Sequence, residues 1–70
     1  MDLSKLKELR EASPFVPFTD RMADGRSWRV QSRDFIAIPP PAPDTVLLFK
    51  EDGGFIILHV KQIAEAVLES

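Results

Sequence analysis

The chain has 70 residues, a formal net charge of −2 at pH 7 and no cysteine. This length predicts one domain over residues 1–70, small enough to need tight packing, a disulfide, a metal or a partner subunit for stability. The lack of cysteine excludes disulfides and zinc–thiolate sites, so tight packing or association with another chain remains. The lack of cysteine also fits a reducing cytosol, so we expect a cytoplasmic protein. No membrane partner is expected, because the charge balance is acidic and the longest apolar runs, such as 55–58, cover only four residues.

The chain opens with leucines at every third position, set among charged residues: Leu3, Leu6 and Leu9. This spacing predicts a short amphipathic helix, and its leucines must rest on the remaining fold because three turns are marginal alone in water. Asp2 or Ser4 is suited to cap its N-terminus, and Pro14 ends the helix by about residue 13.

A first hairpin is predicted from strands at 18–22 and 26–31, joined through Asp24-Gly25. A two-residue turn would split the apolar side chains between the two faces of the hairpin. A three-residue loop, with Gly25 in the left-handed region, instead collects them on one face, and we therefore favour it. That face holds Phe18, Met22, Trp28 and Val30, and the polar face holds Thr19, Arg21, Ser27, Arg29 and Gln31.

A short strand at 35–38 and a stiff proline-rich loop at 39–44 lead to a second hairpin. Its strands, 45–50 and 55–60, flank a turn at 51–54. Both strands are apolar on two faces, as in strands covered on both sides. One face is suited to cover the N-terminal helix or the first hairpin, while the other needs a C-terminal element or another subunit.

The last segment fits two structures. An amphipathic helix is favoured by the spacing of Val60, Ile63, Ala64, Val67 and Leu68. The alternative is a tight turn at 61–63 followed by a strand at 64–68. The predicted fold is thus α+β: an N-terminal helix, then a twisted antiparallel sheet or small SH3- or Sm-like barrel of four to five strands, then a short helix or a turn plus strand.

The order of helix, Pro-Phe-x-Pro-Phe at 14–18 and Ala-Asp-Gly-Arg at 23–26 resembles a group of short uncharacterised bacterial proteins. This resemblance implies a fold and no activity. Asp20 departs from the pattern, because it stands where the alternation expects an apolar side chain. More distantly, a helix followed by five short strands resembles the Sm-like barrel of bacterial RNA chaperones, which would make 58–63 a strand running into a tight turn.

Residues that carry chemistry are few. His59 is the sole histidine and stands in an apolar strand, which is more typical of a packed or edge histidine than of a general base. Glu51 and Asp52 are adjacent at a hairpin tip, where carboxylates diverge into water and do not form a catalytic pair. We expect no catalytic, cofactor-binding or metal-binding residue, and hence a protein that is not an enzyme.

The second hairpin carries the main functional prediction. Two continuous apolar strands in so small a domain predict a non-catalytic interaction module that self-associates or acts as an adaptor. The predicted interaction residues are Leu47, Phe49, Phe55, Ile57 and His59. The alternative is an RNA-binding small barrel that uses Arg21, Arg29 and Arg33, although the preferred register places Trp28 on the opposite face from Arg21 and Arg29.

Overall fold

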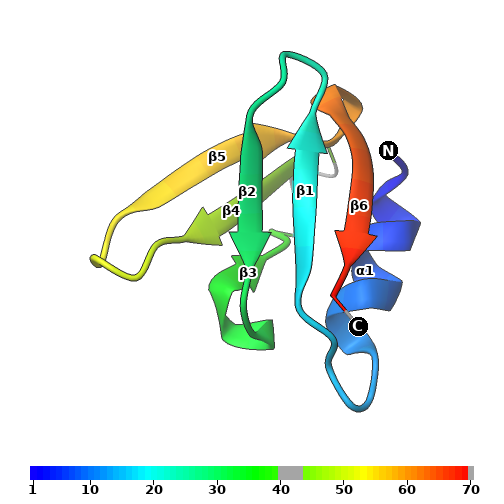
Figure 1. Ribbon diagram of the computed structural model, residues 1–70, viewed down its shortest axis with the longest axis vertical. Coiled ribbons are helices and arrows are strands. Elements are labelled where there is room, and N and C mark those ends of the chain that lie inside the picture. The colour runs from blue at the N-terminus through cyan, green and yellow to red at the C-terminus, as the bar shows by residue number, and fades with distance from the viewer. Residues whose placement is uncertain (40–43, 70) are drawn as a thin grey trace.

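The computed structural model of the chain describes residues 1–39 and 44–69, and Figure 1 shows the course of the elements. Their order is α1 (Leu3–Glu11), β1 (Phe18–Met22), β2 (Ser27–Val30), the 3-10 helix η1 (Arg33–Phe35), β3 (Ile36–Ala37), β4 (Thr45–Phe49), β5 (Phe55–His59), the 3-10 helix η2 (Val60–Gln62) and β6 (Ile63–Leu68). The fold is α+β, as the sequence predicts. Most of the predicted proline-rich loop, 40–43, lies outside the described residues.

Within the described residues the strands form two antiparallel sheets of three strands, with the orders β2-β1-β6 and β3-β4-β5. In Figure 1 the β4–β5 hairpin projects away from the first sheet on the β2 side, while α1 lies behind β6. The first sheet joins the first hairpin to the last strand. The second sheet is built from the chain segments between them.

The helix α1 forms where the leucine stripe predicts it. Asp2 caps it, because its carboxylate Oδ1 accepts a hydrogen bond from the backbone N–H of Ser4 at 3.1 Å. Its other end is held by Arg33, whose guanidinium donates to the carbonyl oxygens of Arg10 and Ala12 at 2.8 and 2.6 Å. Both ends of the helix thus have partners for backbone groups that would otherwise lack them.

The first hairpin has the predicted register. Phe18 lies opposite Val30 and Asp20 opposite Trp28, and the N–H of Met22 donates to the carbonyl of Arg26 at 2.7 Å. Gly25 has a φ of 95°, in the left-handed region that favours glycine. The three-residue loop is therefore confirmed, and the separation of apolar from polar residues on the two faces follows from it.

The preferred C-terminal helix is wrong, and the alternative of a turn followed by a strand describes the structure. η2 makes the turn, and β6 then pairs with β1 from Ile63 opposite Met22 to Leu68 opposite Phe18. A helix would have left the second edge of β1 without hydrogen bonds. Pairing satisfies those backbone groups, which outweighs the moderate helix propensity of the segment. Val67 and Leu68 consequently end up exposed.

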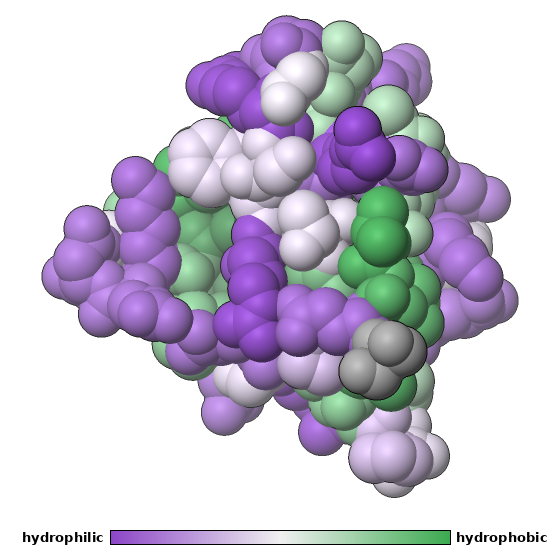
Figure 2. Space-filling model, viewed as in Figure 1, coloured by the Kyte–Doolittle hydropathy of each residue, from purple (hydrophilic) through white to green (hydrophobic). Residues whose placement is uncertain are grey.

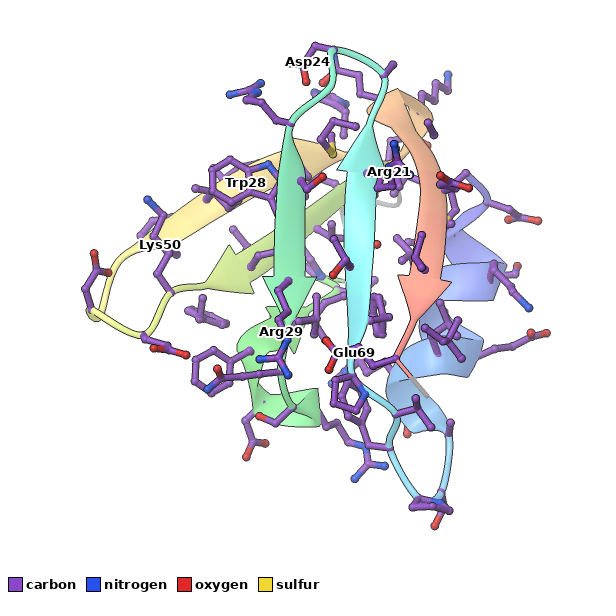
Figure 3. The ribbon with its side chains drawn as sticks, viewed as in Figure 1. Arg21, Asp24, Trp28, Arg29, Lys50 and Glu69 are labelled. Carbon is purple, nitrogen blue, oxygen red and sulfur yellow. The ribbon has the colours of Figure 1, made fainter. Side chains whose placement is uncertain are left out.

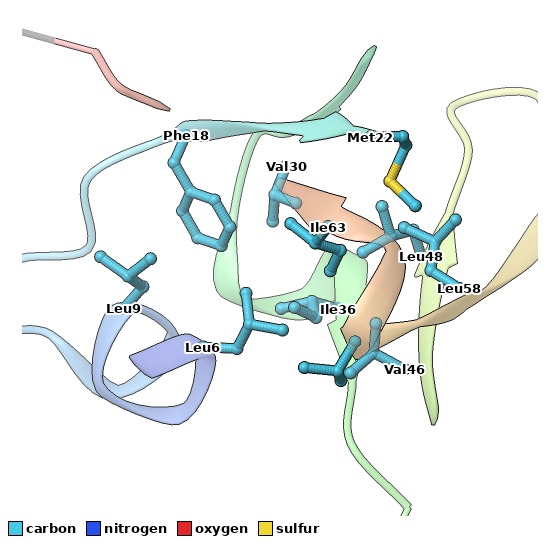
Figure 4. Close-up of a cluster of buried hydrophobic side chains, with 11 residues drawn as sticks. Leu6, Leu9, Phe18, Met22, Val30, Ile36, Val46, Leu48, Leu58 and Ile63 are labelled. Atoms are coloured by element: carbon cyan, nitrogen blue, oxygen red, sulfur yellow. The ribbon is translucent and has the colours of Figure 1, made fainter. Parts of the chain in front are cut away.

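One hydrophobic core receives side chains from α1 and from both sheets (Figure 4). Leu6 and Leu9 reach it from the helix, and Phe18 and Val30 from the first sheet. The inward faces of β4 and β5 add Val46, Leu48 and Leu58. Burial of these side chains, each stabilising by about 1.5–3 kcal/mol, is what holds the two sheets and the helix together.

Candidate functional site

The outer face of the β4–β5 hairpin carries four apolar side chains that are paired across the strands. Leu47 lies opposite Ile57 and Phe49 opposite Phe55, and the two phenylalanine rings tilt toward each other with their centroids 6.5 Å apart. We call these four residues the hairpin patch. Alternation explains their position: their neighbours along each strand point inward to the core.

Most of the hairpin patch is open to solvent. The exposed fractions are 40% for Phe49, 58% for Phe55 and 61% for Ile57, while Leu47 is half-buried. Isolated exposed apolar residues are ordinary on protein surfaces, but a contiguous group of them marks an interaction surface more often. β5 is also an edge strand of its sheet in the described structure, so its free side adjoins the patch.

The fifth predicted interaction residue, His59, shares the outer face with the hairpin patch. It is exposed at the end of β5 and lies opposite Thr45. No ion pair involves His59 within residues 1–39 and 44–69. Alternation of the strand thus places all five predicted residues on one face.

The carboxylates at the hairpin tip have a local role. Asp52 accepts a hydrogen bond from the backbone N–H of Gly54 at 2.8 Å, which closes the turn between β4 and β5. Gly53 occupies the left-handed region with a φ of 94°. Glu51 and Asp52 are both exposed. No group of three or more residues able to hold a metal ion occurs in the part of the chain that the structure describes.

Two of the three arginines of the predicted RNA site, Arg21 and Arg29, share the polar face of the first sheet, while Arg33 lies on η1, and each of the three guanidinium groups already has a partner. Arg21 forms an ion pair with Glu65 at 3.2 Å, and Arg29 donates two hydrogen bonds to Glu69 at 2.6 and 3.0 Å (Figure 3). Those bonds raise the pKa of Arg29 and lower the pKa of Glu69. Arg33 caps α1. RNA binding through these residues stays a prediction, and the occupied guanidinium groups weaken it.

Asp20 is the unusual titratable group of the domain. It has no exposed surface, and neither oxygen of its carboxylate has a hydrogen-bond partner among the described residues. Burial raises the pKa of Asp20 to about 6. The register explains its position, since Asp20 stands between Phe18 and Met22 on the inward face of β1. It lies away from the hairpin patch and takes no part in it.

A cleft that the sequence did not reveal lies between β2 and the β4–β5 hairpin. Its volume is about 220 Å³, and its apolar wall comes from Trp28, Phe35, Leu48 and Ile56. Figure 2 shows this hollow beside the hydrophilic hairpin tip, with hydrophobic surface inside it. It exists because η1 interrupts the chain between β2 and the two-residue strand β3, so β2 does not continue alongside β4.

Comparisons with known proteins add no relative: no family model, no curated protein and no solved structure matches this chain. Within residues 1–39 and 44–69, no helix has the length and apolar character needed to cross a membrane.

Proposed function

We propose that this protein is a non-catalytic interaction module that associates with a second copy of itself through the hairpin patch. The observation that carries the proposal is the in-register pairing of Phe49 with Phe55 and of Leu47 with Ile57 on an exposed outer face. These side chains are not needed inside the core, which the inward residues of the same strands already fill.

A second copy is a suitable occupant because the patch matches itself. Two copies related by a two-fold axis present the same four apolar residues to each other, so each covers what the other exposes. The patch residues themselves carry no charge, which removes the like-charge repulsion that would oppose such contact. Each apolar square ångström removed from water stabilises the assembly by about 25 cal/mol before the cost of association is subtracted.

The test is solution mass, measured by light scattering over a concentration series for the unaltered chain and for Ile57→Lys. We expect the mass of the unaltered chain to rise above that of a monomer with concentration, and Ile57→Lys to stay monomeric. Val67→Lys is the matched control. Val67 is also a β-branched, exposed residue of an edge strand, but it belongs to β6 in the other sheet.

The controls distinguish association through the hairpin patch from non-specific hydrophobic association. Equal loss of association in Ile57→Lys and Val67→Lys would show that the contact is non-specific. A monomer of the unaltered chain at every concentration would overturn self-association. Circular dichroism of each variant shows whether the fold is retained, which is expected because both side chains are exposed.

A further inference from the structure

The strand β2 has one open edge. It lies at the end of its sheet, with β1 as its ladder partner in the described structure. The bond from the Met22 N–H to the Arg26 carbonyl fixes which residues face β1. Alternation in an antiparallel ladder then directs the N–H and C=O groups of Ser27 and Arg29 away from β1. The backbone there is a free template for one more strand.

The cleft lies along this open edge. Trp28, Arg29 and Gln31 form its β2 side, and its far wall comes from the hairpin. In Figure 1 the hairpin diverges from β2 on the side away from β1 and β6. A segment that paired with β2 would therefore lie with its alternate side chains directed into an apolar recess, which is how added strands are recognised.

The size of the cleft indicates what it can hold. Pockets for drug-sized ligands have volumes of roughly 300–1,000 Å³. The cleft, at about 220 Å³, is smaller and is lined largely by side chains such as Leu48 and Ile56. It is suited to a single aliphatic or aromatic side chain from a longer chain.

A positive charge at the rim of the cleft favours an acidic side chain in the bound segment. The Nζ of Lys50 lies 5.8 Å from the ring centroid of Trp28. Figure 3 shows the Lys50 side chain directed toward the Trp28 ring. No carboxylate lies within ion-pair distance of Lys50 among residues 1–39 and 44–69. Arg29, in contrast, is engaged by Glu69, and Glu51 is an exposed carboxylate on the same rim. Lys50 is thus the cation available to a bound acid.

We propose that the open edge of β2 and the cleft bind an extended peptide segment of a partner protein. The segment pairs with β2 through its backbone, places one apolar side chain against Trp28 and Leu48, and directs an acidic side chain two residues away toward Lys50. The two-residue spacing follows because residues i and i+2 of a strand share a face. This site is separate from the hairpin patch, although Phe49 lies at the border between them.

The sole tryptophan of the chain reports on binding, since Trp28 lines the cleft. The probes are acetylated and amidated heptapeptides of threonine that contain Leu-Thr-Glu or, for the opposite strand direction, Glu-Thr-Leu. We expect at least one series to change the tryptophan fluorescence with a Kd of about 0.01–1 mM. Replacement of the peptide leucine by alanine is expected to weaken binding about tenfold.

Backbone pairing is tested with N-methylated peptides. The N–H groups of a strand point alternately to its two sides, so methylation of one alternate set removes the bonds to β2 and methylation of the other set does not. We expect loss of binding in one set and near-normal binding in the other. Equal effects from both sets would overturn strand pairing.

The acidic preference is tested by exchanging charges. Lys50→Glu is expected to weaken the binding of the glutamate peptides at least about fivefold. The same variant should bind the corresponding lysine peptides more tightly than the unaltered chain does. Lys61→Glu is the matched control, because Lys61 is exposed on η2 and does not line the cleft. No saturable change with either series up to about 1 mM, or tighter binding of an oligouridine than of any peptide, would overturn the proposal.

Discussion

Asp20 lies directly opposite Trp28 in the ladder between β1 and β2, and both side chains carry a buried polar atom without a hydrogen-bond partner in the described structure. The carboxylate is a pure acceptor when ionised, and the indole N–H is a donor, yet the two groups are not bonded to each other. An unpaired buried polar group costs free energy, so these two side chains lower the free energy of unfolding of the domain.

Stability of the domain is therefore expected to fall as the pH rises through the range between about 4 and 6. The folded state holds the Asp20 proton up to a pKa of about 6, while the unfolded chain releases it near 3.8. Between these values the folded state binds more protons, so each step up in pH weakens it. The full difference corresponds to about 3 kcal/mol at pH 7.

Urea denaturation of the unaltered chain and of Asp20→Asn across this range measures the effect. Asp20→Asn is expected to be more stable at pH 7 by about 1–3 kcal/mol, because the uncharged amide avoids the cost of burying an ion although it is still unpaired. The difference between the two curves should vanish toward pH 4. Asp34→Asn, which removes an exposed carboxylate from η1, serves as the control. A constant difference at all pH values would contradict the role of Asp20.

Leu6→Ala is expected to lower the free energy of unfolding by about 3 kcal/mol, because Leu6 is fully buried and its truncation leaves a cavity where α1 meets the sheets. The total free energy of unfolding of a domain of this length is roughly 4–10 kcal/mol, so the melting temperature should drop markedly. Lys7→Ala, one residue further along the same helix and exposed, should leave the unfolding midpoint nearly unchanged. Equal effects would mean that α1 is not docked through its leucine face.

Gly25→Ala is expected to destabilise the first hairpin by about 1–2 kcal/mol. The cause is the positive φ of this residue and not a clash, since no atom lies within 4 Å of the position that a Cβ would take. Gly25→Asn should lower the stability less, because asparagine tolerates the left-handed region better than alanine does. Chemical denaturation of both variants gives the order, and a smaller loss with alanine would contradict the assigned turn.

Arg33→Ala is expected to destabilise the fold by about 1 kcal/mol, because two charge-assisted hydrogen bonds to the end of α1 disappear. Arg21→Ala removes an exposed ion pair with Glu65 and should change stability by less than about 0.5 kcal/mol. Thermal unfolding of the two variants separates a structural arginine from a surface arginine. Similar small changes in both would leave Arg33 free for a role in ligand binding.

The sequence predicts the first hairpin accurately because its residues differ so strongly between the two faces. Only one register puts Phe18, Met22 and Val30 together, and that register also forces Asp20 inward. The same alternation puts Phe55 and Ile57 on one face of the second hairpin. Local pattern is sufficient wherever a strand and its partner are close in the chain and joined by a recognisable turn.

The C-terminal segment shows where local pattern fails. Ile63, Val67 and Leu68 fit a helical stripe, but the structure uses them in a strand whose partner is β1. The free edge of β1 that decides between helix and strand is created by residues far away in the sequence. The cleft beside Trp28 and the capping of α1 by Arg33 depend in the same way on how distant elements meet.

The pairing of β1 with β6 also has a consequence for synthesis on the ribosome. All of residues 23–62 are translated between these two strands, which takes roughly 2–8 s at ordinary elongation rates. A hairpin closes within microseconds, so β1 and β2 are able to pair once both have left the ribosome and before β6 has done so. Until β6 emerges, the second edge of β1 is exposed to other chains. Pro17 before the strand, and Asp20 and Arg21 within it, are residues of the kind that discourage intermolecular strand pairing. The buried carboxylate of Asp20, which lowers the stability of the folded domain, thereby discourages the incomplete chain from pairing with other chains.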